Sequence, residues 1–120
     1  MTDSAPIPEL LTTARAEAGV LVLATIHGEV DLHNSPSLRK LLLDSLKRWQ
    51  PKKLILNMAK VPYVDSSAIA VLVEALKELR RTQGRVMLIE LQPRVKGLLE
   101  IARLDSIFVI VKDEREALEL

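Results

Sequence analysis

The chain has 120 residues, which suits one domain with a single core and is too short for two independent domains. Apolar residues make up 48 % of the chain but only Trp49, Tyr63 and Phe108 are aromatic, so stacking platforms for bases or sugars are nearly absent. The 17 Lys and Arg against 16 Asp and Glu give no basic field for nucleic acid, and the lack of cysteine excludes disulfides and thiolate chemistry.

The N-terminal residues predict a flexible leader, 1–8, followed by a single domain, 9–120. Pro6 and Pro8 stand among small polar residues in this leader. Asp3 lies where a secretory signal needs positive charge, and no apolar run follows it. No stretch approaches about 18 uninterrupted apolar residues, the length typical of a membrane span. We therefore expect a cytoplasmic protein without membrane insertion.

The first predicted elements are two strands and a helix. GVLVLATIHGEVD, residues 19–31, suits a buried strand, and the weaker segment LLTTARAEAG, residues 10–19, is expected to pair with it as a hairpin. In NSPSLRKLLLDSLKRW, residues 34–49, apolar side chains recur every three or four positions, which predicts an amphipathic helix. Ser35 is the expected N-cap, because Pro36 lacks only an amide hydrogen that has no partner there.

The middle of the chain holds a strand and the most strongly patterned helix. KKLILNM, residues 52–58, is a short apolar run that predicts a central strand covered on at least one face. PYVDSSAIAVLVEALKELRR, residues 62–81, contains the helix. The expected apolar stripe is Ile69, Leu72, Val73, Leu76 and Leu79. The expected ion pairs, three residues apart, are Glu74 with Lys77 and Glu78 with Arg81.

The last third continues the alternation. Gly84 is the expected end of the long helix, and RVMLIEL, residues 85–91, predicts a strand. PRVKGLLEIARL, residues 93–104, predicts a short helix, and SIFVIV, residues 106–111, predicts the last strand. A capping-box spacing that begins at Asp113 predicts a final helix.

This order of elements predicts an α/β fold with right-handed crossovers. We expect a central, mixed and mainly parallel β-sheet of about five strands with about four α-helices. Polar sites of such sheets collect where strands end and helices begin. Two junctions of this kind, GEVDLHNSPS at residues 28–37 and PYVDSSA at residues 62–68, are expected to lie side by side on one edge.

Asp65, Ser66 and Ser67 at the second junction allow several interpretations. Helix capping alone accounts for one of them, because a side-chain oxygen there accepts from an unpaired amide. A small serine hydrolase would join one serine to His27 or His33 and an Asp, but the G-x-S-x-G turn is missing. The two histidines lack carboxylates at ligand spacing, and no glycine-rich phosphate loop is present, so no metal and no cofactor is expected.

GEVDLHNSPSLRKLL followed by NMAKVPYVDSSAIAVLVEAL resembles the STAS domain of anti-sigma factor antagonists. Two signatures carry the resemblance, a G-E-[LVI]-D turn and a [MV]-D-S-[ST]-G-[LI] turn, and it extends over residues 10–120. Ala68 stands where most members have Gly. The added methyl is expected to restrict the backbone and the approach of a partner, and Ala also favours the helix.

The resemblance implies that Ser66, directly after Asp65, is a phosphorylation site. It places Asp31 near this acceptor and makes Ser67 a residue of the helix start. The implied partner-binding residues are Asp31, Asp65, Ser66, Ser67 and Ala68. No catalytic residue is implied, and the protein is expected to be a binding module and not an enzyme.

The resemblance also implies a partner. The unmodified protein would bind an anti-sigma factor that is a serine kinase of the histidine-kinase-like ATPase type, and so free the sigma factor. Phosphorylation by that kinase with ATP would end the binding, and a serine phosphatase would restore it. The alternative within the family is a STAS subunit that docks on an ATPase of a membrane transport or signalling assembly, without a phosphorylation switch.

Overall fold

The computed structural model of the protein describes residues 13–17 and 21–120. Its elements are β1 Thr13–Glu17, β2 Leu21–His27, α1 Ser35–Trp49, β3 Lys53–Lys60, α2 Ser66–Arg80, β4 Arg85–Ile89, α3 Pro93–Ile101, β5 Val109–Val111 and α4 Glu114–Glu119. This order confirms the predicted alternation, although β5 is shorter than the strand expected at residues 106–111. The leader predicted at residues 1–8 and the chain between β1 and β2, residues 18–20, lie outside the described residues.

The described strands form one five-stranded sheet in the order β1-β2-β3-β4-β5. β1 pairs antiparallel with β2, with Ala14 opposite Ala24, as the predicted hairpin requires. The pairs β2 with β3, β3 with β4 and β4 with β5 are all parallel. The predicted mixed, mainly parallel sheet is therefore confirmed, and the carboxyl ends of the parallel strands share one edge, where polar sites gather.

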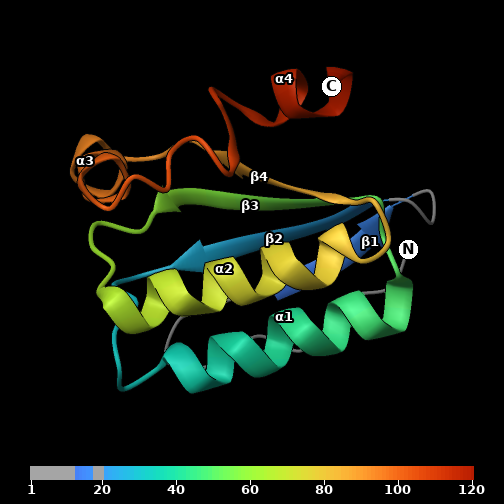
Figure 1. Cartoon of the computed structure of the whole chain (residues 1–120), viewed down its shortest axis with the longest axis horizontal. Coiled ribbons are helices and arrows are strands. Elements are labelled where there is room, and N and C mark those ends of the chain that lie inside the picture. Colours follow the sequence, from blue (N-terminus) through green and yellow to red (C-terminus); the bar gives the residue numbers. More distant parts are fainter. Residues whose placement is uncertain (1–12, 18–20) are drawn as a thin grey trace.

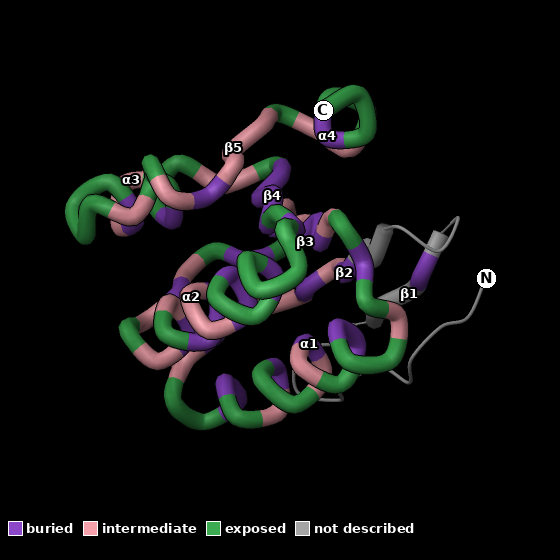
Figure 2. The backbone as a smooth tube through the Cα atoms, turned by 45° about the vertical axis from the view of Figure 1, so that its right-hand side comes forward, coloured by how far each residue is buried: buried purple, intermediate pink, exposed green. Residues whose placement is uncertain are grey.

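Helices pack on both faces of the sheet. α1 and α2 lie side by side on one face, and α4 lies on the other (Figure 1). Leu54 and Leu56 of β3 belong to the core beneath α1 and α2, while Ile55 packs with Ala117 of α4. Because side chains alternate along a strand, a strand covered on both faces has a continuous apolar run. Figure 2 shows that β3 and β4 are largely buried, while the outer turns of α1 are exposed.

The buried face of α2 is rotated from the predicted one. Its buried residues are Ala68, Val71, Leu72, Ala75, Leu76 and Leu79. Ile69 and Val73, both expected in the stripe, are only half-buried. The small side chains of Ala68 and Ala75 are part of the main core instead.

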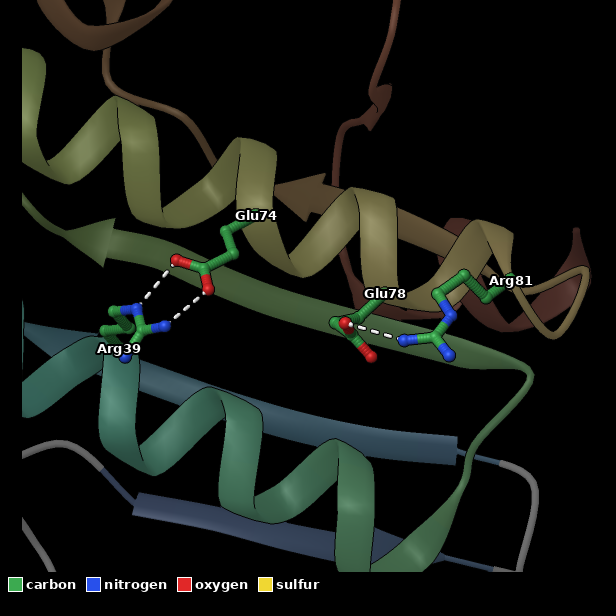
Figure 3. Close-up of polar contacts among 4 residues, drawn as sticks. All are labelled: Arg39, Glu74, Glu78 and Arg81. Atoms are coloured by element: carbon green, nitrogen blue, oxygen red, sulfur yellow. Dashed lines mark hydrogen bonds and ion pairs between the residues drawn. The ribbon is translucent and has the colours of Figure 1, made fainter.

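Figure 3 shows two of the ion pairs that lie along α1 and α2. Arg39 of α1 reaches across to Glu74 of α2, with Nε and Nη2 donating to the two carboxylate oxygens at 2.7 and 2.6 Å. This hydrogen bond is the main cause that lowers the pKa of the Glu74 carboxyl. Glu74 therefore bonds Arg39 and not the predicted Lys77. Lys77 lowers the pKa of the Glu74 carboxyl only by electrostatic attraction. The predicted pair of Arg81 with Glu78 is confirmed, at 3.2 Å.

The helices are short. α1 and α2 have 15 residues each, and α3 and α4 have 9 and 6. Within the described part of the chain, none of them has the length and apolar character needed to cross a membrane.

Candidate functional site

The two junctions singled out in the sequence lie side by side, as predicted. Val30 forms a parallel bridge with Val64 beyond the ends of β2 and β3. The Val30 amide donates to the Tyr63 carbonyl at 3.0 Å, and the Asp65 amide donates to the Val30 carbonyl at 3.0 Å. These bonds fix the loop of residues 28–34 beside the first turn of α2.

Asp65 joins the start of α2 to this loop through its side chain. Oδ1 accepts from the amides of Ser67 and Ala68 at 2.9 and 3.1 Å, which caps the helix. Oδ1 also accepts from the Ser67 hydroxyl at 2.6 Å, and Oδ2 accepts from the amide of Leu32 at 3.0 Å. The hydrogen bond from the Ser67 hydroxyl is the main cause that lowers the pKa of the Asp65 carboxyl, with the three amides adding to it. The side chain is therefore a carboxylate at neutral pH.

Asp31 shapes its own loop. Its Oδ1 accepts from the His33 amide at 2.9 Å, and its amide donates to Asn34 Oδ1 at 2.9 Å. The Val30 carbonyl and the Leu32 amide, on either side of Asp31, both bond Asp65, so Asp31 lies beside the first turn of α2. Its predicted place at a partner surface stays a prediction.

The N-cap predicted for α1 is wrong by one residue. Asn34 occupies the cap position and Ser35 is the first helical residue. The Asn34 side chain makes no cap hydrogen bond, because both of its polar atoms are used within the preceding loop. Its Nδ2 donates to the Glu29 carbonyl at 2.9 Å, and its Oδ1 accepts from the Asp31 amide. The Ser35 amide instead donates to the Asp31 carbonyl at 2.8 Å.

The two adjacent serines differ in environment. Ser66 is the first residue of α2 and is exposed, and its hydroxyl makes no hydrogen bond to any residue that the structure describes. Ser67 is half-buried, and its hydroxyl donates to Asp65. Of the two hydroxyls, that of Ser66 is therefore the more accessible from solvent.

Ala68 is 1 % exposed, and its methyl lies in the core. The expectation that this methyl restricts the approach of a partner is not supported, because a partner at the surface would not touch it. Any partner contact by Ala68 is limited to its backbone, whose amide donates to Asp65.

The described residues do not assemble the hydrolase alternative. Ser67 has Asp65 as its partner, and among the residues that the structure describes neither Ser66 nor Ser67 bonds a histidine. Residues 13–17 and 21–120 also contain no group of three or more His, Asp or Glu side chains that could hold a metal ion.

A third segment, which the sequence patterns did not reveal, contacts the chain just before α2, on the side away from the loop of residues 28–34. Gln92 Nε2 donates to the Ala59 carbonyl at 2.9 Å. The Arg94 guanidinium lies over the Tyr63 ring, 4.8 Å from its centroid, a cation–π contact. Residues this far apart in the chain give no local pattern that would have revealed these contacts.

A groove of about 570 Å³ lies between α1 and α2 and extends from Arg39 and Glu74 to the C-terminal ends of the two helices, away from Ser66. Its lining includes Leu43, Leu46, Lys47, Pro51, Leu79 and Thr82, together with the residues of the two ion pairs in Figure 3. The groove therefore does not belong to the site at Ser66.

The fold and the site define a small α/β domain that presents an exposed serine at the start of a helix, between two loops. The STAS domain family model matches residues 12–117, so the chain belongs to the STAS domain family. This finding agrees with the fold and with both signature turns.

Two curated relatives illustrate the range of the family. The chain is 32 % identical over 94 residues to the anti-sigma-B factor antagonist of Listeria monocytogenes, covering 76 % of this chain and 79 % of that protein. It is 36 % identical over 86 residues to a sulfate transporter of Bacillus subtilis, YvdB, covering 72 % of this chain but 16 % of the transporter.

Solved structures support the fold. An anti-sigma factor antagonist from Mycobacterium paratuberculosis aligns with a TM-score of 0.82 and 18 % identity, over 95 % of this chain and 96 % of that one. SpoIIAA of Bacillus in its phosphorylated form aligns with a TM-score of 0.69 and 20 % identity, over 88 % and 95 %.

Proposed function

We propose that the protein is an anti-sigma factor antagonist that binds an anti-sigma factor while Ser66 is unmodified and releases it when Ser66 is phosphorylated. The observation that carries this proposal is the exposed Ser66 hydroxyl, free of hydrogen bonds to described residues, at the first position of α2. The names of relatives such as the Listeria antagonist support the binding activity, and the phosphorylated form of SpoIIAA supports the modification.

The partner is proposed to be a serine kinase of the histidine-kinase-like ATPase type. In the reaction, the Ser66 Oγ attacks the γ-phosphorus of ATP, the bond from that phosphorus to the β-phosphate oxygen breaks, and ADP leaves. The hydroxyl proton passes to a base of the kinase. This chain supplies the acceptor and the docking surface and no catalytic group, and ATP and its metal ion belong to the partner.

The switch follows from charge. Phosphoserine adds a charge of about −1.5 to −2 at pH 7 next to the Asp65 carboxylate. The amides of Ser67 and Ala68 already donate to Asp65, so they do not neutralise the new charge fully. The exposed first turn keeps the phosphate in water, and the fold tolerates it. A partner packed over Ser66 would have to desolvate both anions, so phosphorylation weakens binding and not the fold.

The surface proposed for the partner consists of Asp31, Asp65, Ser66, Ser67 and the backbone of Ala68. We place this activity in the cytoplasm, with a serine phosphatase that restores the unmodified form. Fractionation of cells would test the location.

The test compares Ser66→Ala and Ser66→Asp in binding to the purified anti-sigma kinases of the source organism, with Ser106→Asp, at an exposed serine outside the proposed surface, as control. We expect Ser66→Ala to bind like the wild type and to take up no phosphate from ATP. Ser66→Asp should bind at least about tenfold more weakly, because like charges at an interface are costly. Equal affinity of Ser66→Ala and Ser66→Asp would overturn the charge switch.

The similarity to the sulfate transporter favours a second candidate, a STAS subunit that docks on an ATPase of a membrane transport or signalling assembly. In that case the same surface binds its partner without phosphorylation of Ser66. Phosphopeptide mapping after incubation with kinase and ATP separates the two, because only the switch gains phosphate on Ser66.

A further inference from the structure

We propose that Asp65 is the specificity-determining residue that directs phosphorylation to Ser66, by engaging the hydroxyl of the neighbouring Ser67. This inference rests on the proposed function and adds a positioning residue to it. Two serines follow each other at the start of α2, and their residue types do not distinguish them.

The contacts of Ser67 distinguish them. Its Oγ lies 2.6 Å from Asp65 Oδ1, a short hydrogen bond to a charged acceptor, which is among the stronger kinds in proteins. Ser67 is also half-buried, whereas Ser66 is exposed. To reach a kinase, the Ser67 hydroxyl must leave the carboxylate and rotate toward solvent. A bond of this strength opposes that rotation by about tenfold or more.

A carboxylate beside a hydroxyl can also act as a base that activates it, so the two roles need to be separated. Asp65 accepts from the amides of Ser67, Ala68 and Leu32 as well as from the Ser67 hydroxyl. These four donors stabilise its charged form, so it takes up a proton less readily than an ordinary Asp. Its negative charge also repels the phosphates of incoming ATP. Asp65 therefore lowers the reactivity of the Ser67 hydroxyl toward phosphorylation.

Phosphoryl transfer to either serine has the same chemistry. An Oγ–P bond forms, the bond between the γ-phosphorus of ATP and the β-phosphate oxygen breaks, and the hydroxyl proton goes to a base of the kinase. The starting states differ, because the Ser67 hydroxyl donates a hydrogen bond to Asp65, whereas the Ser66 hydroxyl bonds no described residue.

Each variant is treated with kinase and ATP, and the test measures, within that variant, the ratio of phosphate on Ser67 to phosphate on Ser66. This ratio is independent of how tightly each variant binds the kinase. In Asp65→Asn the cap is kept and the charge is removed, and we expect the ratio to rise about tenfold. Asp113→Asn, a matched change at the cap of α4, should leave the ratio unchanged. A ratio that stays constant in Asp65→Asn overturns the inference, and a lower ratio shows that Asp65 activates Ser67.

A second measurement needs neither the kinase nor a change at Asp65. In Ser67→Ala, the carboxyl pKa of Asp65 followed by NMR should rise toward its ordinary value, because the hydroxyl donor is lost. An unchanged pKa would show that the hydroxyl is not engaged, and would overturn the inference even if Asp65→Asn fails to fold. If the wild type takes phosphate on neither serine, the proposed function fails and this inference fails with it. If it takes phosphate on Ser66 and the ratio is insensitive to Asp65, only the inference fails.

Discussion

Replacement of Ala68 by Gly should lower the free energy of unfolding by about 1.5 kcal/mol. Ala68 is 1 % exposed, so the substitution removes one buried methyl, worth about 0.8 kcal/mol. Gly adds a backbone cost of up to about 1 kcal/mol inside a helix, and less in the first turn. For a domain of this size each kcal/mol corresponds to about 4 °C in Tm, so the expected loss is about 6 °C.

Two matched variants of α2 separate the contributions. Ala70→Gly is exposed and carries only the backbone cost, and Ala75→Gly, fully buried, carries both costs. Urea and thermal unfolding measure all three, while the phosphorylation rate of Ala68→Gly should equal that of the wild type. A severalfold faster phosphorylation would refute our reasoning, because it would mean that the methyl faces the kinase and not the core.

Three further predictions concern other positions. Gly84→Ala should destabilise the protein by about 1–3 kcal/mol, because its Cβ would lie 2.6 Å from Leu79 Cδ2 and 3.2 Å from two carbonyl oxygens. Gly97→Ala should stabilise the protein by up to about 1 kcal/mol, because the added Cβ inside α3 would meet nothing within 4 Å. Calorimetry measures the stability of both glycine variants, and equal effects of the two substitutions would contradict this account. Arg39→Met should raise the pKa of Glu74, which Arg39 lowers in the folded state. The stability that Glu74 contributes is present above its unfolded pKa and lost as pH falls through the folded one, so it should shrink in this variant; an unchanged NMR titration would argue against the pair.

The sequence allowed the element order and the meeting of the two junctions to be predicted, because both depend on periodicity and on the handedness of crossovers. The buried face of α2 is also visible in the spacing of its residues, once alanines are counted as apolar. Ala68, Leu72, Ala75 and Leu79 follow helical spacing, but alanines carry little weight in a search for large apolar residues. Both alanines are nevertheless buried in the main core.

Other features could not be predicted because they depend on competition between partners. The Asn34 side chain could either cap α1 or hydrogen-bond the preceding loop, and in the structure it bonds the backbone of Asp31 and Glu29 in that loop. Glu74 has a cation within reach on its own helix, yet Arg39 of α1 bonds it. Whether Ser66 or Ser67 has a free hydroxyl likewise depends on one side-chain rotamer. The sequence pattern is thus enough to locate the candidate site, while the chemical state of its side chains can be read only from their hydrogen bonds in the structure.

The order of the strands in the sheet has a consequence for how the chain folds. Each described strand after β1 pairs with the described strand that precedes it in the sequence, so strands are added to the sheet in chain order. The parallel partners still lie 32 residues apart, as in Leu21 with Lys53 and Lys53 with Arg85, so each parallel pairing must wait until its crossover helix has been made. As synthesis proceeds, each completed strand-and-helix unit can join the edge left by the previous one. The start of α2 can pair with the loop after β2 as soon as β3 has been added, before the last third of the chain has been synthesised.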